Sequence, residues 1–123
     1  MSSFIHIQNL DKRIKVTPRV KFCDSFGCRL RGLMFRSQLQ KDEGLLLVIE
    51  RDSRIDSSIH MLFVPFDLAV FWINSNMEVV DRRIARSWRP AYFPINAARY
   101  ILEIHSSRID DYEIGHKVEF QNA

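Results

Sequence analysis

Residues 68–84 read Leu-Ala-Val-Phe-Trp-Ile-Asn-Ser-Asn-Met-Glu-Val-Val-Asp-Arg-Arg-Ile, and this stretch decides the fold. Leu68 to Ile73 is continuous and apolar, Asn74 to Met77 has the composition of a short turn, and Glu78 to Ile84 returns as a partner strand. The pattern predicts a β-hairpin. It overlaps a longer apolar segment, Ile59 to Val80, which a polar loop precedes.

A second apolar run, Gly44 to Ile49, is too short for a free-standing helix and is typical of a strand buried on both faces. We expect it at the centre of a sheet. Shorter strands are predicted at Phe4 to Gln8, at Ile14 to Val16 continuing into Val20 to Cys23, at Arg99 to His105 and around Val118 to Phe120. The strands nearest the N-terminus are expected at the sheet edge.

One helix is predicted from Phe26 to Arg36, after Asp24 or Ser25 as the cap. Its apolar residues Phe26, Leu30, Leu33 and Met34 have the spacing of a single helical face. A further single turn is expected near Ser106 to Tyr112. Many short strands with one or two short helices indicate a mostly β (β-rich α+β) protein, a compact β-sandwich or partly open barrel.

The chain has 123 residues, 46% of them hydrophobic, so a single domain over 1–123 is expected. Eighteen Lys and Arg against 15 Asp and Glu give a net charge of +3, which makes nucleic acid an unlikely partner. No run approaches the roughly 20 apolar residues that span a bilayer, and the start has no signal-peptide pattern. We expect a cytoplasmic protein, monomer or dimer, without membrane contact.

The only two cysteines, Cys23 and Cys28, are too few for a disulfide framework or a four-ligand zinc site. They are predicted to be small buried hydrophobic side chains; a redox pair is the alternative, although it lacks the usual two-residue spacing. The four histidines show no ligand-spaced pair, so no metal and no cofactor is expected. They are His6, His60, His105 and His116.

His60, at the start of the apolar segment, is the first candidate site residue because a histidine can serve as base, ligand or anion contact. No motif supplies a nucleophile or carboxylate partner for it, so no catalytic residue is assigned. Arginines gather after the hairpin and favour contact with an anion. The candidate ligand-binding residues are therefore His60, Arg82, Arg86, Arg89 and Trp88.

The segment Arg31-Gly32-Leu33-Met34-Phe35-Arg36 resembles the signature that opens the family called domain of unknown function 192, small prokaryotic proteins of compact β-rich fold. The resemblance covers a family-like core of about 14–120 and includes Glu43 to Leu47, Ser58 to His60, Ser87 to Pro90, Ala98 to Ile104 and Ile114 to Val118. It implies the fold and no reaction. Asp67 matches a family aspartate by identity. An alignment without gaps from His60, however, places that family aspartate two residues later than Asp67.

Clustered arginines without catalytic spacing favour a non-catalytic binding or assembly module for an anionic ligand or a protein partner. It would use the loop-rich end near His60 and the Arg82 to Arg89 stretch. The alternative is a small hydrolase or isomerase with His60 as general base. Nucleic-acid binding is the third hypothesis.

Overall fold

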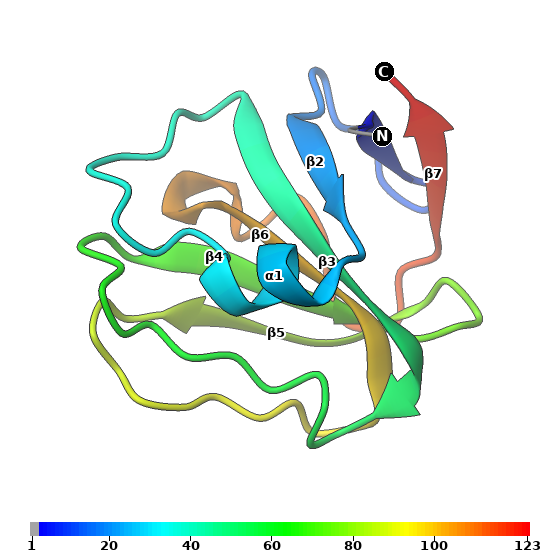
Figure 1. Cartoon of the computed structure of the whole chain (residues 1–123). Coiled ribbons are helices and arrows are strands. Elements are labelled where there is room, and N and C mark those ends of the chain that lie inside the picture. The colour runs from blue at the N-terminus through cyan, green and yellow to red at the C-terminus, as the bar shows by residue number, and fades with distance from the viewer. Residues whose placement is uncertain (1–2) are drawn as a thin grey trace.

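A computed structural model describes residues 3–123. Its regular elements, shown in Figure 1, are β1 (Phe4–Asn9), β2 (Arg19–Cys23), α1 (Phe26–Arg31), β3 (Glu43–Ser53), β4 (Leu68–Ile73), β5 (Val79–Ala85), β6 (Ala98–His105), the 3₁₀ turn η1 (Ser106–Arg108) and β7 (Val118–Asn122). No helix in this part of the chain has the length and apolar character needed to cross a membrane.

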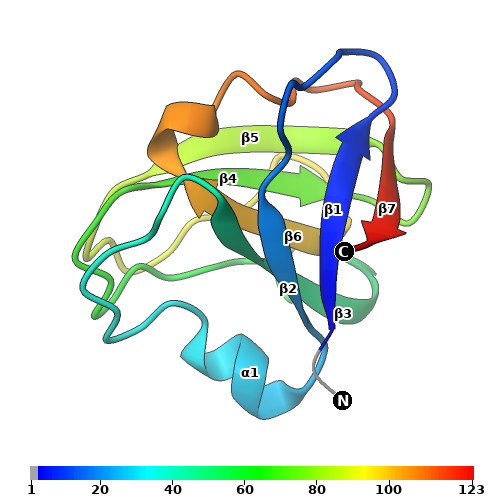
Figure 2. The same ribbon diagram turned by 90° about the horizontal axis from the view of Figure 1, so that it is seen from above.

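The seven strands form one sheet in the order β5-β4-β6-β3-β2-β1-β7. All neighbours are antiparallel except β2 and β3, which are parallel. Figure 2 shows β4 and β5 crossing the direction of β1 and β2, so the sheet curls into a half-barrel. The predicted mostly β fold is confirmed, and its form is that of a partly open barrel.

The predicted hairpin is confirmed as β4 and β5, paired from Leu68 with Ala85 to Ile73 with Val79. Every residue of β4 is buried because β5 and β6 flank it and both of its faces are covered. Alternating side chains enter two apolar layers. Val70 and Trp72 join one layer, and Phe71 and Ile73 join the other.

The Gly44 to Ile49 run lies in β3, the middle strand of the sheet, as predicted. Its residues alternate between the same two layers, with Leu47 in one and Leu46 in the other. Gly44 sits where β2 and β6 approach closely, and a methyl group at this position would come within 2.6 Å of Ile104 Cγ2. A glycine is therefore needed at this position of the sheet.

The predicted strands at Phe4 to Gln8 and Val20 to Cys23 exist, but their expected edge position is wrong. β1 lies between β2 and β7, and the sheet edges are β5 and β7. The C-terminal strand adds outside β1, a long-range pairing that no local pattern encodes. Ile14 to Val16 belongs to the connection before β2 rather than to a strand.

The predicted helix ends five residues early, at Arg31, because Gly32 caps it with a φ of 50° and donates its N–H to Cys28 O. The expected apolar face is therefore wrong: Phe26 and Leu30 are each 63% exposed, while Leu33 is buried beyond the helix. Ser25 caps the helix, as one of the two predicted candidates.

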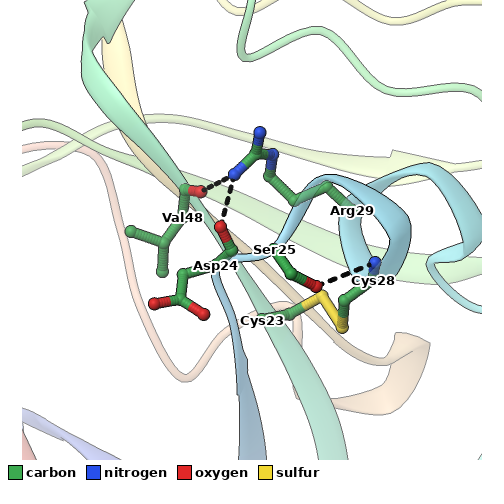
Figure 3. Close-up of a disulfide and its surroundings, with 6 residues drawn as sticks. All are labelled: Cys23, Asp24, Ser25, Cys28, Arg29 and Val48. Carbon is green, nitrogen blue, oxygen red and sulfur yellow. Dashed lines mark hydrogen bonds between the residues drawn. A yellow bond between two sulfur atoms is a disulfide. The ribbon is translucent and has the colours of Figure 1, made fainter.

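Cys23 and Cys28 form a disulfide, with their Cα atoms 5.7 Å apart, so the prediction of two unbonded buried thiols is wrong. The end of β2 and the first turn of α1 bring the two residues together, and Ser25 Oγ accepts the Cys28 N–H at 3.2 Å (Figure 3). The bond fastens α1 to the sheet. Its sequence separation of five residues closes a short loop.

Replacing Cys28 by Ser is expected to lower the free energy of unfolding by about 2 kcal/mol, the chain-entropy value for so short a loop. Urea unfolding followed by circular dichroism measures it. Wild-type protein in dithiothreitol should match the variant, whereas the variant should not respond to the reductant. Equal unfolding midpoints for the wild type with and without reductant would contradict the Cys23–Cys28 disulfide.

Candidate functional site

A pocket of about 450 Å³ lies between α1, the end of β3 and the loop that leads to His60. Leu47 and Ile101, both buried in the core, provide apolar lining. Phe26 and Leu30, which project from α1, add apolar surface to its walls while remaining largely exposed. The volume and the lining suit a small organic molecule with an apolar body.

Arg29 supplies a fixed positive charge to this pocket. Its Nη1 donates to Asp24 O at 2.6 Å and to Val48 O at 3.1 Å, contacts that Figure 3 shows. The other guanidinium nitrogens have no hydrogen-bond partner within residues 3–123. Because one nitrogen anchors the half-buried side chain, the remaining donors are held in place for an anion at little entropic cost.

Two further pocket residues can donate to an anion. Arg51 is exposed, and its side chain makes no hydrogen bond or ion pair within the described chain. His60 is half-buried, and its Nδ1 accepts the Leu62 N–H at 3.2 Å. In the neutral imidazole this acceptor role places the proton on Nε2, which becomes a donor. Glu50 and Asp56 also line the pocket, and their carboxylates would repel an anion placed near them.

A smaller cavity of about 60 Å³ adjoins the pocket and shares five of its lining residues, Arg29, Leu30, Leu47, Ser58 and His60. Glu103 of β6 also lines this cavity and is only 4% exposed. It has no ion pair in the described residues, and desolvation raises the pKa of its carboxyl to about 7. The pocket therefore leads toward a buried group that exchanges a proton near neutral pH.

Glu103 is the site residue that sequence reasoning missed. The sequence did hold a sign of it, because Glu103 alternates onto the same face of a predicted strand as Ile101. The structure buries that face. Arg29 was not among the predicted ligand-binding residues, because its contact with Val48 O of β3 depends on how the helix packs on the sheet.

The structure does not bring the predicted site residues together. Arg82 lies on the face of β5 next to η1, where it donates to Ile109 O and Tyr112 O. Arg86 pairs with Asp67 at 2.8 Å. The pKa of Asp67 is lowered, first by the hydrogen bond from the Ser87 N–H and then by this contact with Arg86. Only His60 lines the pocket, while Trp88 and Arg89 belong to a neighbouring loop surface.

The remaining histidines have local structural contacts. His6 Nδ1 contacts Pro18 O and Thr17 Oγ1, and His116 Nδ1 contacts Asn9 Nδ2 at 2.8 Å. His105 Nδ1 accepts the Ser107 N–H and so caps η1. Within residues 3–123, no three His, Cys, Asp or Glu side chains are grouped to hold a metal ion.

Together these features define a class of small β-rich domain, built on one curled sheet with a pocket beside the short helix α1. The chain belongs to the family called domain of unknown function 192, described as "Uncharacterized ACR", whose model matches residues 7–120. The resemblance seen in the signature segment is thereby confirmed.

Relatives from Pyrococcus and Thermococcus species are themselves uncharacterised proteins. The chain is 35% identical over 114 residues to a UPF0127 protein of Pyrococcus furiosus, covering 91% of this chain and 95% of that protein. It is 36% identical over 107 residues to one of Thermococcus sibiricus, covering 85% and 68%. It is 40% identical over 85 residues to one of Thermococcus kodakarensis, covering 69% of this chain but 52% of that protein.

Two crystal structures share the fold. One is of a candidate transcription regulator from Sinorhizobium meliloti, with a TM-score of 0.83 and 17% identity, covering 98% of this chain and 94% of that chain. The other is of a protein of unknown function from Novosphingobium aromaticivorans, with a TM-score of 0.79 and 18% identity, covering 94% and 83%. At these identities the likeness concerns the fold alone.

Proposed function

We propose that this protein is a non-catalytic binding module that holds a small organic anion in the pocket beside His60. The observation that carries the proposal is the Arg29 guanidinium, anchored by two backbone carbonyls at the wall of a pocket with both apolar and charged lining. A cation in such a place is prepared for a carboxylate or phosphate group. Arg51 adds a second charge at the same pocket.

The ligand class follows from the lining. The apolar lining provided by Leu47, Ile49 and Ile101 favours a ring or a branched chain, and the arginines favour one anionic group attached to it. The Nε2 donor of His60 fits an oxygen of that group. We therefore expect aromatic or branched carboxylates and phosphate monoesters to bind, and their neutral analogues to bind poorly.

A small hydrolase or isomerase remains the second candidate, and the observation in its favour is Glu103, a proton-carrying group near His60. Against it, His60 Nδ1 already accepts the Leu62 N–H, and Nε2 of the neutral imidazole carries the proton. Neither nitrogen therefore has a free lone pair with which to act as base. Hydrolysis of 4-nitrophenyl acetate decides between the two. A rate above buffer that is lost in His60→Ala would favour the enzyme.

The cytoplasmic location and arginine-rich surface expected from the sequence are part of the proposal. In a reducing cytoplasm the Cys23–Cys28 bond would open, because cytosolic thiols are kept reduced. Since α1 carries Arg29 and borders the pocket, binding needs to be measured with the disulfide both closed and open.

Thermal unfolding with phenyl phosphate, benzoate and neutral benzamide tests the proposal. The two anions are expected to raise the melting temperature, since a ligand that binds only the folded state stabilises it. Arg51→Glu should weaken anion binding about tenfold or more, equivalent to ~1.4 kcal/mol. Arg13→Glu, an exposed arginine in the β1–β2 connection, is the charge-matched control and should bind like the wild type. Equal effects of benzamide and benzoate would refute the proposal.

A further inference from the structure

Three exposed aromatic side chains from separate loops form a single cluster, which we call the aromatic triad: Phe35, Phe63 and Trp88. They are 70%, 45% and 53% exposed, respectively. The Phe35 and Phe63 ring centroids are 5.1 Å apart, and those of Phe63 and Trp88 are 5.2 Å apart. Large aromatic side chains gathered in solvent in this way mark an interaction surface rather than a core.

The backbone beneath the triad is strained. Phe35, Phe63 and Trp88 have φ values of 65°, 63° and 66°, in the left-handed region that bulky residues avoid. Each such conformation costs about 1–2 kcal/mol, and residues of this kind gather at ligand clamps and other functional sites. Three of the four non-glycine residues with positive φ in the described chain belong to this one cluster.

Backbone hydrogen bonds join the loops that carry the triad. Phe35 N–H donates to Phe63 O, Trp88 N–H donates to Met61 O and Met61 N–H donates to Arg89 O, each at 2.8 Å. The three loops therefore form one bonded unit. Because these bonds already join the loops, a partner that packs against the triad orders little additional backbone on binding.

The same three loops carry a surplus of positive charge. Arg36 pairs with Glu43 at 2.6 Å and Arg86 pairs with Asp67, so these charges are balanced locally. Arg31, at the end of α1, and Arg89, next to Trp88, are exposed and have no carboxylate partner in residues 3–123. The charge around the triad is thus complementary to an acidic partner.

We propose that the aromatic triad is a docking site for a short segment of another protein, one that carries an aromatic or aliphatic anchor between acidic residues. The anchor would pack on Phe63 and Trp88, and its flanking carboxylates would meet Arg89 and Arg31. A second copy of this chain fits less well, because two identical surfaces would face each other with like charges. None of the three triad residues lines the pocket beside His60.

Synthetic peptides provide the test. Glu-Asp-Phe-Asp-Glu is expected to bind and change the fluorescence of exposed Trp88, whereas Trp72 is buried and should contribute little change. Glu-Asp-Ala-Asp-Glu, which lacks the anchor, and Lys-Lys-Phe-Lys-Lys, which reverses the charge, should each bind about tenfold more weakly or worse, a difference of ~1.4 kcal/mol.

Calorimetric titration of protein variants with Glu-Asp-Phe-Asp-Glu shows where on the protein this peptide binds. Phe63→Ala and Arg89→Glu should each weaken the binding about tenfold, equivalent to ~1.4 kcal/mol. Ile114→Ala is the matched control, since Ile114 is 56% exposed and lies near the turn end of the β4–β5 hairpin, away from the triad. Circular dichroism confirms that each variant is folded.

Several outcomes would overturn the proposal: equal binding of the Phe and Ala peptides, or full binding by Phe63→Ala. Tighter binding of a single-stranded oligonucleotide than of the acidic peptide would assign the triad to nucleic acid instead. A dimer in sedimentation that Phe63→Ala dissociates would assign it to a second copy of this chain.

Discussion

Gly44→Ala is expected to destabilise the protein by about 3 kcal/mol, the upper part of the range for overpacking a core. The added methyl group would come within 2.6 Å of Ile104 Cγ2, 2.7 Å of Glu103 O and 3.0 Å of Val20 Cγ1. The contact at Glu103 is with backbone, so a change of rotamer cannot relieve it. Urea unfolding measures the loss.

Gly27→Ala is the matched control for this prediction. Gly27 lies in α1, has no positive φ, and a methyl group there would meet nothing within 4 Å. Alanine should therefore raise the free energy of unfolding by about 0.5–1 kcal/mol through helix propensity. Similar destabilisation by both substitutions would contradict the close approach of β2, β3 and β6 at Gly44.

Glu103→Gln is expected to stabilise the protein above pH 7 by about 3 kcal/mol, because the buried carboxylate is removed while its shape is kept. Desolvation raises the pKa of Glu103 from 4.5 to about 7 in the folded state. Below pH 4.5 the carboxyl is protonated in both states and carries no penalty. Between pH 4.5 and 7 the unfolded state loses its proton first, so stability falls as the pH rises.

Unfolding free energies of wild type and Glu103→Gln, measured from pH 4 to 8, test this linkage. The two proteins should differ little at pH 4, diverge as the pH rises from about 4.5 to about 7, and keep a constant difference above pH 7. Glu119→Gln is the control, since Glu119 is exposed on β7 and should leave the pH dependence unchanged. Parallel curves for wild type and Glu103→Gln would show that Glu103 is not held in a desolvated environment.

Local patterns predicted most of the strands. The hairpin was readable because Leu68 to Ile73 is continuously apolar and a polar turn follows it. The apolar run of β3 indicated burial on both faces in the same way. The length of α1 was not readable, since Gly32 ends the helix while Leu33 continues the apolar spacing and is buried without being helical.

The candidate site was only partly predictable because it is built from distant segments. His60 was found from its position beside an apolar run, but Arg29, Arg51 and Glu103 meet it only through the sheet order β6-β3-β2. The disulfide was missed because two cysteines alone do not reveal that a strand and a helix turn bring them together. Arg82 was predicted to bind a ligand with Arg86 and Arg89 because the three are close in sequence. Side chains alternate along a strand, so the Arg82 side chain lies on one face of β5 and that of Arg83 on the other.

Titration of ¹⁵N-labelled protein with phenyl phosphate, followed by amide chemical shifts, tests the central proposal most directly. We expect saturable shifts concentrated at residues that line the pocket, with Arg51, His60 and Ile101 among the largest. Benzyl alcohol, which has the ring without the anion, should give none at equal concentration. Saturable shifts confined to Arg82 and η1, or no shifts with either compound, would contradict an anion-binding pocket beside His60.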